Sequence, residues 1–209
     1  MVKVGEHPTF FPMSYYYKTD ENLPEQAIKI KWQFQGQDFC FHSNRGIFSK
    51  DKIDKGSIYL LDYLLSLPLQ GKLLDVGCGY GVLGIVAKSH YPDLAVTMVD
   101  INQRAVTATV SNCEQNNVEA QVFYSDLFSV ISENFDMIIS NPPIRAGKKV
   151  VQRLIEEAYE HLLPGGSLLL VIRKQQGALS WRQFIVNCFG NCEIIKGKQG
   201  YCLLRANRA

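Results

Sequence analysis

"LLDVGCGYGVLG", residues 73–84, is the stretch that most directly indicates how this 209-residue chain folds. An apolar run ends at Asp75, glycines follow at every second position (Gly77, Gly79 and Gly81), and a helical pattern begins after them. Glycine permits positive φ angles and lets a ligand approach the backbone, while the first N–H groups of a helix have no partner within it. The stretch therefore predicts a strand, a turn and a helix, with a pocket of nucleotide-binding type at the turn.

The chain around this stretch alternates short apolar runs with longer amphipathic ones. The apolar runs predict strands at 72–76, 94–100, 120–124, 135–140 and 167–172, and the amphipathic runs predict helices at 81–90, 103–116, 148–162 and 180–189. Near-continuous apolar strands separated by helices are typical of a mostly parallel sheet that is buried on both faces. The last two apolar runs are too close in sequence for a helical crossover and predict an antiparallel hairpin at one edge. The predicted class is α/β, with a seven-stranded sheet.

The pattern before residue 72 is different. Residues 28–34 and 38–43 alternate apolar and polar side chains on either side of "QGQ", which predicts a small β-hairpin. Asp54, with Ser57 three positions on, is placed to cap a helix that ends before Pro68. We therefore expect an N-terminal arm and hairpin over 1–46, and the main domain with its lead-in helix over 47–209.

Composition narrows the class of protein. Hydrophobic residues make up 46% of the chain and charged residues 20%, with a net charge of +2, so neither disorder nor a general nucleic-acid charge pattern is indicated. No apolar run has the length of a membrane helix, and the N-terminus lacks the apolar core of a signal peptide. Six scattered cysteines without a C-x-x-C pair predict reduced thiols and no metal site. We expect a cytoplasmic protein without membrane or metal partners.

A second acidic residue narrows the ligand. Asp100 ends the next predicted strand, where a carboxylate is able to accept both hydroxyls of a ribose. A dinucleotide dehydrogenase would need G-x-G-x-x-G, but position 82 is Val82, and no histidine falls at a strand end that would line the cleft. The sequence instead resembles motif I of the class I methyltransferases, D-x-G-x-G-x-G. Asp126 ends the third strand, where such enzymes hold the adenine amine; the alternative is a solvated helix cap.

The resemblance implies S-adenosyl-L-methionine as the cofactor. The implied binding positions are Asp75, Gly77, Cys78, Gly79, Asp100, Ile101, Asp126, Leu127 and Asn141.

A second motif, "FDMIISNPPIRAGKK" at 135–149, ends the fourth strand. Proline cannot continue a β ladder and restricts the residue before it, so Asn141, Pro142 and Pro143 are expected to present fixed oxygen acceptors to the cleft. Acceptors that hold the hydrogens of an exocyclic amine help its nitrogen to attack a methyl group and stabilise the charge that develops. The motif resembles the (D/N)-P-P-(Y/F) motif of amine methyltransferases, with Ile144 in place of the stacking aromatic residue. The alternative is a Pro-Pro loop that only ends a strand.

Longer stretches narrow the resemblance. "GIFSKDKIDKGSIYLLDYLL", "DVGCGYGVLGI" and "ISNPPIRAGKKVVQRLIEEAYEHLLPGGSLLLVIRKQQG" together resemble the small-methyltransferase-domain family, from about Tyr15 onward and in a single-domain form. Its RsmC-type members methylate guanine N2 in small-subunit ribosomal RNA. The resemblance implies a 16S rRNA guanine-N2 methyltransferase in which Asn141 and Pro142 meet the target amine. It also implies that Phe48 packs over the cofactor; the alternative is that Phe48 belongs to the core.

Basic residues support a polyanionic substrate independently. Arg145, Lys148, Lys149 and Arg153 follow Asn141 without an intervening acid. They are suited to grip RNA phosphates; the alternative is a solvated helix start. The expected partner is ribosomal RNA or the small ribosomal subunit. Methylation of adenine N6 or a protein glutamine, and a non-catalytic cofactor-binding RNA module, stay open as alternatives.

Overall fold

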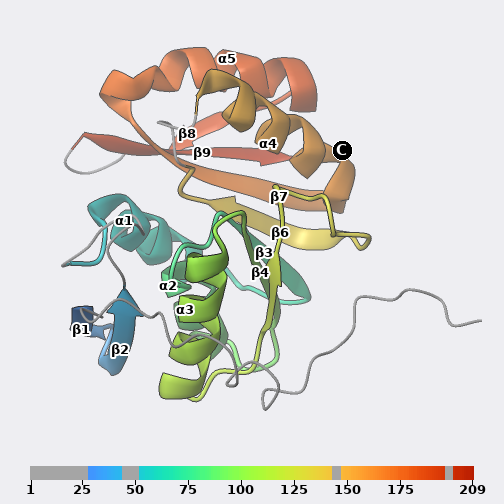
Figure 1. Cartoon of the computed structure of the whole chain (residues 1–209). Coiled ribbons are helices and arrows are strands. Elements are labelled where there is room, and N and C mark those ends of the chain that lie inside the picture. Colours follow the sequence, from blue (N-terminus) through green and yellow to red (C-terminus); the bar gives the residue numbers. More distant parts are fainter. Residues whose placement is uncertain (1–27, 44–51, 143–146, 196–199) are drawn as a thin grey trace, which may run out of the picture.

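The computed structural model describes residues 28–43, 52–142, 147–195 and 200–209, and its centre is a seven-stranded sheet (Figure 1). The strands of the sheet are β3 (Lys72–Val76), β4 (Ala95–Asp100), β5 (Gln121–Tyr124), β6 (Phe135–Ser140), β7 (Leu162–Arg173), β8 (Glu193–Ile195) and β9 (Tyr201–Asn207). The helices are α1 (Lys55–Leu64), α2 (Val82–His90), α3 (Gln103–Gln115), α4 (Lys148–His161) and α5 (Ala178–Phe189), with a 3-10 turn η3 (Lys174–Gln176). A separate hairpin pairs β1 (Ile28–Phe34) with β2 (Gln37–Ser43).

The order of strands in the sheet is β5-β4-β3-β6-β7-β9-β8. Strands β3 to β7 pair in parallel, and β9 lies antiparallel between β7 and β8. In chain order, β4 and β5 are added on one side of β3, and β6 and β7 are then added on its other side. The reversal point lies between β3 and β6, and ligands of open α/β sheets bind at the carboxyl edge beside such a point.

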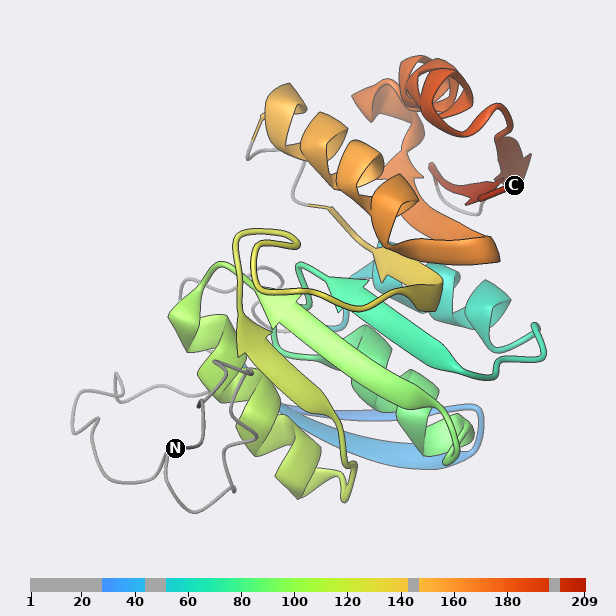
Figure 2. The ribbon, with the colours of Figure 1, turned by 90° about the vertical axis from the view of Figure 1, so that its right-hand side faces the viewer.

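Helices cover both faces of the sheet (Figures 1 and 2). Each face carries its own hydrophobic layer. On β3, Leu73 packs with α1, α2 and α3, and the next residue, Leu74, packs with α4 and α5, as the two-residue period of a strand requires. Both leucines are fully buried. Burial on both faces explains why the strands are near-continuous apolar runs, and the predicted α/β class is confirmed.

Two asparagines attach the hairpin to the main domain. Asn112 on α3 exchanges hydrogen bonds with the backbone of His42, accepting at 2.7 Å and donating at 3.0 Å. One helical turn later, Asn116 does the same with Cys40, at 2.9 and 2.8 Å. The carboxamides thus pair with β2 as a neighbouring strand would, and β2 of the blue hairpin in Figure 2 packs against α3. The boundary expected at 46–47 lies outside the described residues.

The observed element bounds differ most from the expected ones at the start of strand β7, whereas the lead-in helix has its predicted cap. The lead-in helix begins at Lys55, directly after its cap Asp54, whose Oδ1 accepts from the N–H groups of Gly56 and Ser57. Strand β7 begins at Leu162, five residues before the predicted 167, because Leu162 already pairs with Phe135. Within the described residues no helix is both long and apolar enough to cross a membrane.

Candidate active site

The glycine-rich turn after β3 forms one wall of the site. Gly77, Gly79 and Gly81 have φ angles of 72°, 60° and 90°, a left-handed region that residues with a side chain rarely adopt. The N–H groups of Gly77 and Cys78 both donate to the carbonyl of Val99, at 2.8 and 3.0 Å. The turn is therefore tied to the end of β4.

Asp75 lies fully buried beneath this turn. Its Oδ2 accepts a hydrogen bond from the N–H of Gly84 at 3.2 Å, whereas its Oδ1 has no partner among the described residues. Burial raises the pKa of the Asp75 carboxyl to about 7; the hydrogen bond from Gly84 opposes this shift, and the charge of Asp100 adds to it. An unpaired buried acceptor carries a desolvation cost, which a cationic ligand group would offset.

Asp100, at the end of β4, closes the turn from the other side. Its Oδ2 accepts from the N–H of Gly79 at 2.9 Å and its Oδ1 accepts from the N–H of Asn102 at 2.8 Å. Burial raises the pKa of Asp100, and these backbone hydrogen bonds oppose the shift. Since each carboxylate oxygen has two lone pairs, both oxygens keep an acceptor site for a pair of ligand hydroxyls.

The cleft beside Asp100 runs from the glycine turn to α4. Its lining residues are Val76, Gly77, Val99, Asp100, Ile101, Ser125, Asp126, Leu127, Pro142, Val150, Val151 and Leu154. Six candidates from widely separated motifs thus line one pocket: Gly77, Asp100, Ile101, Asp126, Leu127 and Pro142. Val76 of β3, Val99 of β4 and the three lining residues of α4 make its apolar walls, and Asp100 and Asp126 supply carboxylates.

The side chain of Cys78 does not line the cleft and points toward α3. Its thiol lies 3.7 Å from the hydroxyl of Thr109 on α3 and is buried, and burial raises its pKa. The same hydroxyl donates to the carbonyl of Gly79 at 2.9 Å. Any contribution of Cys78 to the site would therefore come through its backbone.

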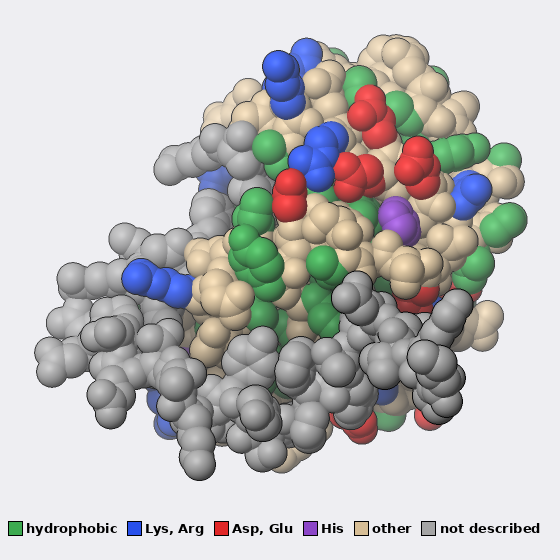
Figure 3. Space-filling model, turned by 45° about the vertical axis from the view of Figure 1, so that its right-hand side comes forward, with side chains coloured by type: hydrophobic (Ala, Val, Ile, Leu, Met, Phe, Trp, Pro, Cys, Tyr) green, Lys and Arg blue, Asp and Glu red, His purple; other side chains and the backbone are tan. Residues whose placement is uncertain are grey.

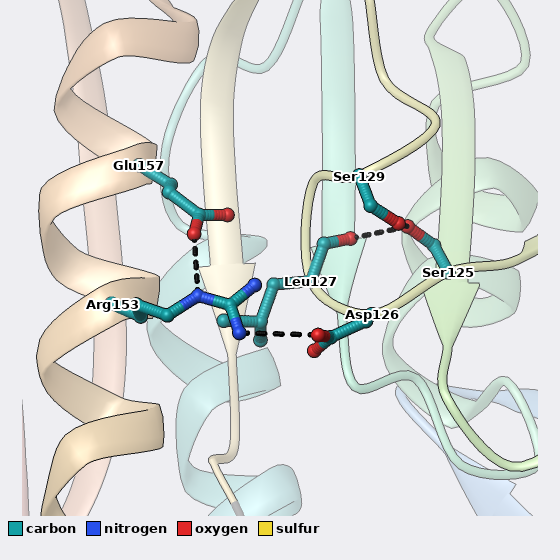
Figure 4. A network of polar contacts seen from close by, with 6 residues as sticks. All are labelled: Ser125, Asp126, Leu127, Ser129, Arg153 and Glu157. Atoms are coloured by element: carbon teal, nitrogen blue, oxygen red, sulfur yellow. Dashed lines mark hydrogen bonds and ion pairs between the residues drawn. The ribbon is translucent and has the colours of Figure 1, made fainter.

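Asp126 is part of a polar network at the end of β5 (Figure 4). One oxygen of Asp126 pairs with Arg153 of α4 at 3.1 Å, and Arg153 also pairs with Glu157 at 2.7 Å. Leu127 has a φ of 54°, and the hydroxyl of Ser125 donates to its carbonyl at 2.7 Å. A non-glycine residue in the left-handed region marks a tightly held turn and is frequent at ligand sites.

Arg153 has two carboxylate partners that the sequence interpretation did not include. It was expected on the rim as a cation for phosphates, but two carboxylates already pair with it. The sequence analysis identified neither partner. Glu157 is one helical turn from Arg153, so its spacing could have indicated the pair, whereas Asp126 is distant in sequence. Figure 3 likewise shows basic and acidic side chains side by side on this face, and the described residues in this view form no continuous basic surface.

Lys148 and Lys149 have different surroundings. Both are exposed at the start of α4, which has Gly147 as its N-cap and no acidic residue in its first turn. In the described part of the chain no carboxylate forms an ion pair with either lysine. Their charges add to the positive end of the helix dipole, so this end of α4 favours an anion.

Asn141 follows β6 directly, and its side chain is held from α1. Its Nδ2 donates to Oδ1 of Asp54 at 2.9 Å and to Oγ of Ser57 at 3.0 Å. The preceding residue, Ser140, donates to the carbonyl of Val76 at 2.7 Å and so joins the ends of β6 and β3. Asn141 is thus placed beside the glycine turn. The sequence identified Asp54 only as a helix cap, because its contact with Asn141 spans 87 positions.

Several candidate residues cannot be placed. Phe48, Pro143, Ile144 and Arg145 lie outside the described residues. Among the described residues, no group of three or more His, Cys, Asp or Glu side chains is arranged to hold a metal ion, and the six cysteines are free thiols.

Comparison with known proteins gives a family match and a set of relatives. The model of the family "Methyltransferase small domain" matches residues 38–205. An uncharacterized protein, YbxB of Bacillus subtilis, is 37% identical over 197 residues, which cover 93% of this chain and 98% of that protein. Ribosomal RNA small subunit methyltransferase C of Pasteurella multocida is 38% identical over 164 residues, 75% of this chain and 50% of the relative. The chain thus spans almost all of YbxB but about half of the methyltransferase C relative.

A solved structure shows the same fold. The T. thermophilus 16S rRNA N2 G1207 methyltransferase (RsmC), in complex with AdoMet and guanosine, superposes with a TM-score of 0.81 at 27% identity. The match covers 90% of this chain and 52% of that one. A likeness of this size confirms the class I methyltransferase fold expected from the sequence.

Proposed function

Because the chain belongs to the methyltransferase small domain family, we propose that it transfers a methyl group from S-adenosyl-L-methionine to the exocyclic N2 amine of a guanine in 16S ribosomal RNA. The observation that carries the proposal is the anchored carboxamide of Asn141 at the end of β6, beside the glycine turn. Two relatives support the substrate class: one is named for the small-subunit RNA, and the other is a guanine-N2 enzyme solved with AdoMet and guanosine.

The residues of the turn fit this cofactor. The unpaired Oδ1 of Asp75 suits the cationic amino group of its methionine part, and the open acceptor sites of Asp100 suit the two ribose hydroxyls. Ile101 and Leu127 line the cleft where a base would lie, and Asp126 is beside them to accept from the adenine amine. S-adenosyl-L-methionine supplies an electrophilic methyl group on a sulfonium.

Asn141 and the Pro-Pro motif supply the chemistry proposed for the chain. A guanine amine is a weak nucleophile because its lone pair is delocalised into the ring. An oxygen acceptor at Oδ1 of Asn141, with the backbone carbonyl of Pro142, would hold the amine hydrogens and stabilise the positive charge that forms on nitrogen. The proton lost afterwards is acidic and can pass to water, so no strong general base is required. Such a site prefers amines to hydroxyls.

Recognition of RNA is assigned to the start of α4. Lys148 and Lys149 are exposed and without an acidic partner in the described structure, and four residues separate them in sequence from the Asn-Pro-Pro motif. Arg145, between the motif and these lysines in sequence, is proposed to join them. Arg153 is left out because Asp126 and Glu157 neutralise it. The small ribosomal subunit is the proposed partner, and the cytoplasm the proposed place of action.

The test is transfer of labelled methyl from S-adenosyl-L-methionine to small ribosomal subunits that lack the modification, followed by nuclease digestion. The expected product is labelled N2-methylguanosine. Label in methyladenosine or in protein would keep the amine chemistry and overturn the substrate. Binding of the cofactor without transfer to any of these substrates would instead favour a non-catalytic RNA-binding module.

A further inference from the structure

We propose that Asp54, together with Ser57, is a positioning residue for Asn141, and holds its carboxamide in the orientation that leaves Oδ1 open to an incoming amine. The inference rests on the proposed function for the identity of the reacting group. The orientation itself is a property of three side chains at the start of α1 and the end of β6, and it can be measured without any substrate.

The chemistry of the contact determines which end of the carboxamide is held. A carboxylate has only acceptors, so the atom of Asn141 that lies 2.9 Å from Oδ1 of Asp54 must be the amide nitrogen. The second hydrogen of this nitrogen is donated to the hydroxyl oxygen of Ser57 at 3.0 Å. Within the described ranges, no group donates to Oδ1 of Asn141. The amide end is therefore fully engaged, and among the described residues the acceptor end has no donor.

Asp54 is itself held by groups that cannot easily move. As the N-cap of α1 it accepts from the N–H groups of Gly56 and Ser57, at 2.8 and 3.3 Å. Its second oxygen accepts from the hydroxyl of Tyr201 at 3.4 Å, and the guanidinium of Arg173 lies 4.9 Å from the centre of that tyrosine ring. The starts of α1 and β9 thus meet the end of β6 at one carboxylate. A preorganised acceptor stabilises a developing charge without reorganisation during the reaction.

Gly56 is explained by the same network. Glycine is a poor helix former, yet it stands in the first turn of α1. A Cβ at this position would lie 2.8 Å from Oδ1 of Asp54 and 2.8 Å from Cε1 of Tyr201. The glycine therefore leaves room for the carboxylate to reach Tyr201 and Asn141 together. Gly56→Ala would displace the carboxylate without removing any polar group.

The test is a double-mutant cycle on the single-turnover rate of methyl transfer. Asp54→Ala should lower the rate by about tenfold or more and Ser57→Ala by about threefold, with the dissociation constant of S-adenosyl-L-methionine changed by less than about twofold. In an Asn141→Ala background each change should alter the rate by less than about twofold, because the positioned group is gone. Equal losses in both backgrounds would show that Asp54 acts only through the stability of α1, and would overturn the inference.

Two further variants separate capping from positioning. Asp54→Asn keeps an acceptor oxygen for both the helix N–H groups and the amide of Asn141, so most of the rate should be retained. Asp62→Ala removes an exposed carboxylate from the same helix without touching Asn141, and its rate should equal that of the wild type. A loss in Asp54→Asn as large as in Asp54→Ala would contradict the geometric account.

A spectroscopic measurement separates this inference from the proposed function. The side-chain amide signals of Asn141, assigned by their absence in Asn141→Ala, should show slow hydrogen exchange in the wild-type protein. This exchange should become at least about tenfold faster in Asp54→Ala. If the wild-type protein transfers no methyl group to guanine but the amide is protected, the substrate proposal fails and the orientation stands. If the wild-type amide exchanges as fast as an exposed asparagine, the inference fails whatever the substrate.

Discussion

Asp75 is a buried carboxylate with one unpaired oxygen. The desolvation of this oxygen opposes folding, and a ligand that pairs with it would offset that cost. Its pKa in the folded protein is raised to about 7, above the ordinary value near 4 of an unfolded chain. The protonated form is therefore favoured by folding. The contribution of this group to stability is full below about pH 4 and is lost as the pH rises through about 7.

Asp75→Asn should consequently raise the free energy of unfolding at pH 8 by on the order of a few kcal/mol, and have little effect at pH 4. Urea unfolding of both proteins across this range measures the difference. The comparison between variant and wild type is needed because burial raises the pKa of Asp100 in the same direction. A lower stability of the variant at pH 8 would show that Asp75 gains more from its partners than burial costs.

The same substitution should weaken binding of S-adenosyl-L-methionine. A negative carboxylate attracts the cationic amino group, so wild-type affinity should increase as the pH rises from about 5 to 7, where this amino group stays charged. The affinity of Asp75→Asn should be lower and should change less with pH. Isothermal titration calorimetry provides the measurement. Higher stability together with lower affinity in Asp75→Asn would indicate that Asp75 contacts the ligand. If Asp75 had only a structural role, stability and affinity would both fall.

At the scale of elements, α4 carries cations with and without carboxylate partners, and these should differ in their effect on RNA binding. Lys148→Ala and Lys149→Ala should each raise the KM for ribosomal RNA several-fold at low salt and less at high salt, because exposed phosphate contacts are screened. Arg153→Ala is the matched control. Its charge is already neutralised, and the exposed ion pairs contribute about 1 kcal/mol or less to stability. An equal rise in KM for all three variants would show that the ion pairs of Arg153 do not keep its charge from the RNA.

The packing of α2 on β4 depends on one glycine. A Cβ at Gly84 would lie 2.4 Å from Sδ of Met98, which is fully buried. Gly84→Ala should therefore lower the free energy of unfolding by about 1–3 kcal/mol, measured by chemical denaturation. In a Met98→Ala background the same change should cost less, since the space is then free. Additive losses would mean that the clash is relieved by movement of the helix.

At the scale of the whole molecule, hydrogen bonds from α3 attach the β1–β2 hairpin to the main domain. Asn112 is fully buried. Its carboxamide accepts from the N–H of His42 and donates to the carbonyls of His42 and Tyr80, the latter at 2.8 Å. Asn112→Ala should leave one buried and two part-buried backbone groups unpaired and cost about 2–4 kcal/mol. Amide exchange of β2 should then accelerate more than exchange of β3. Equal acceleration throughout the chain would show that the hairpin and the sheet unfold as one unit.

The sequence was sufficient for the sheet, because strands buried on both faces must be apolar runs and the helices between them must be amphipathic. It also placed Asp75, Asp100 and Asn141 at strand ends that the sheet brings to one edge. It did not reveal the pairing of Asp126 with Arg153 or of Asn112 with His42. Such contacts join residues that are distant in sequence, and each partner alone has an ordinary local interpretation.

The central claim is that Asn141 accepts the target amine. The most direct test compares Asn141→Ala with the wild type in two measurements, the dissociation constant of S-adenosyl-L-methionine and the single-turnover rate of methyl transfer to small subunits that lack the modification. The account predicts an affinity within about twofold of the wild type and a rate lower by about two orders of magnitude, as for loss of a preorganised hydrogen-bonding partner. Equal losses of affinity and rate would show that Asn141 shapes the cofactor pocket and does not act on the amine.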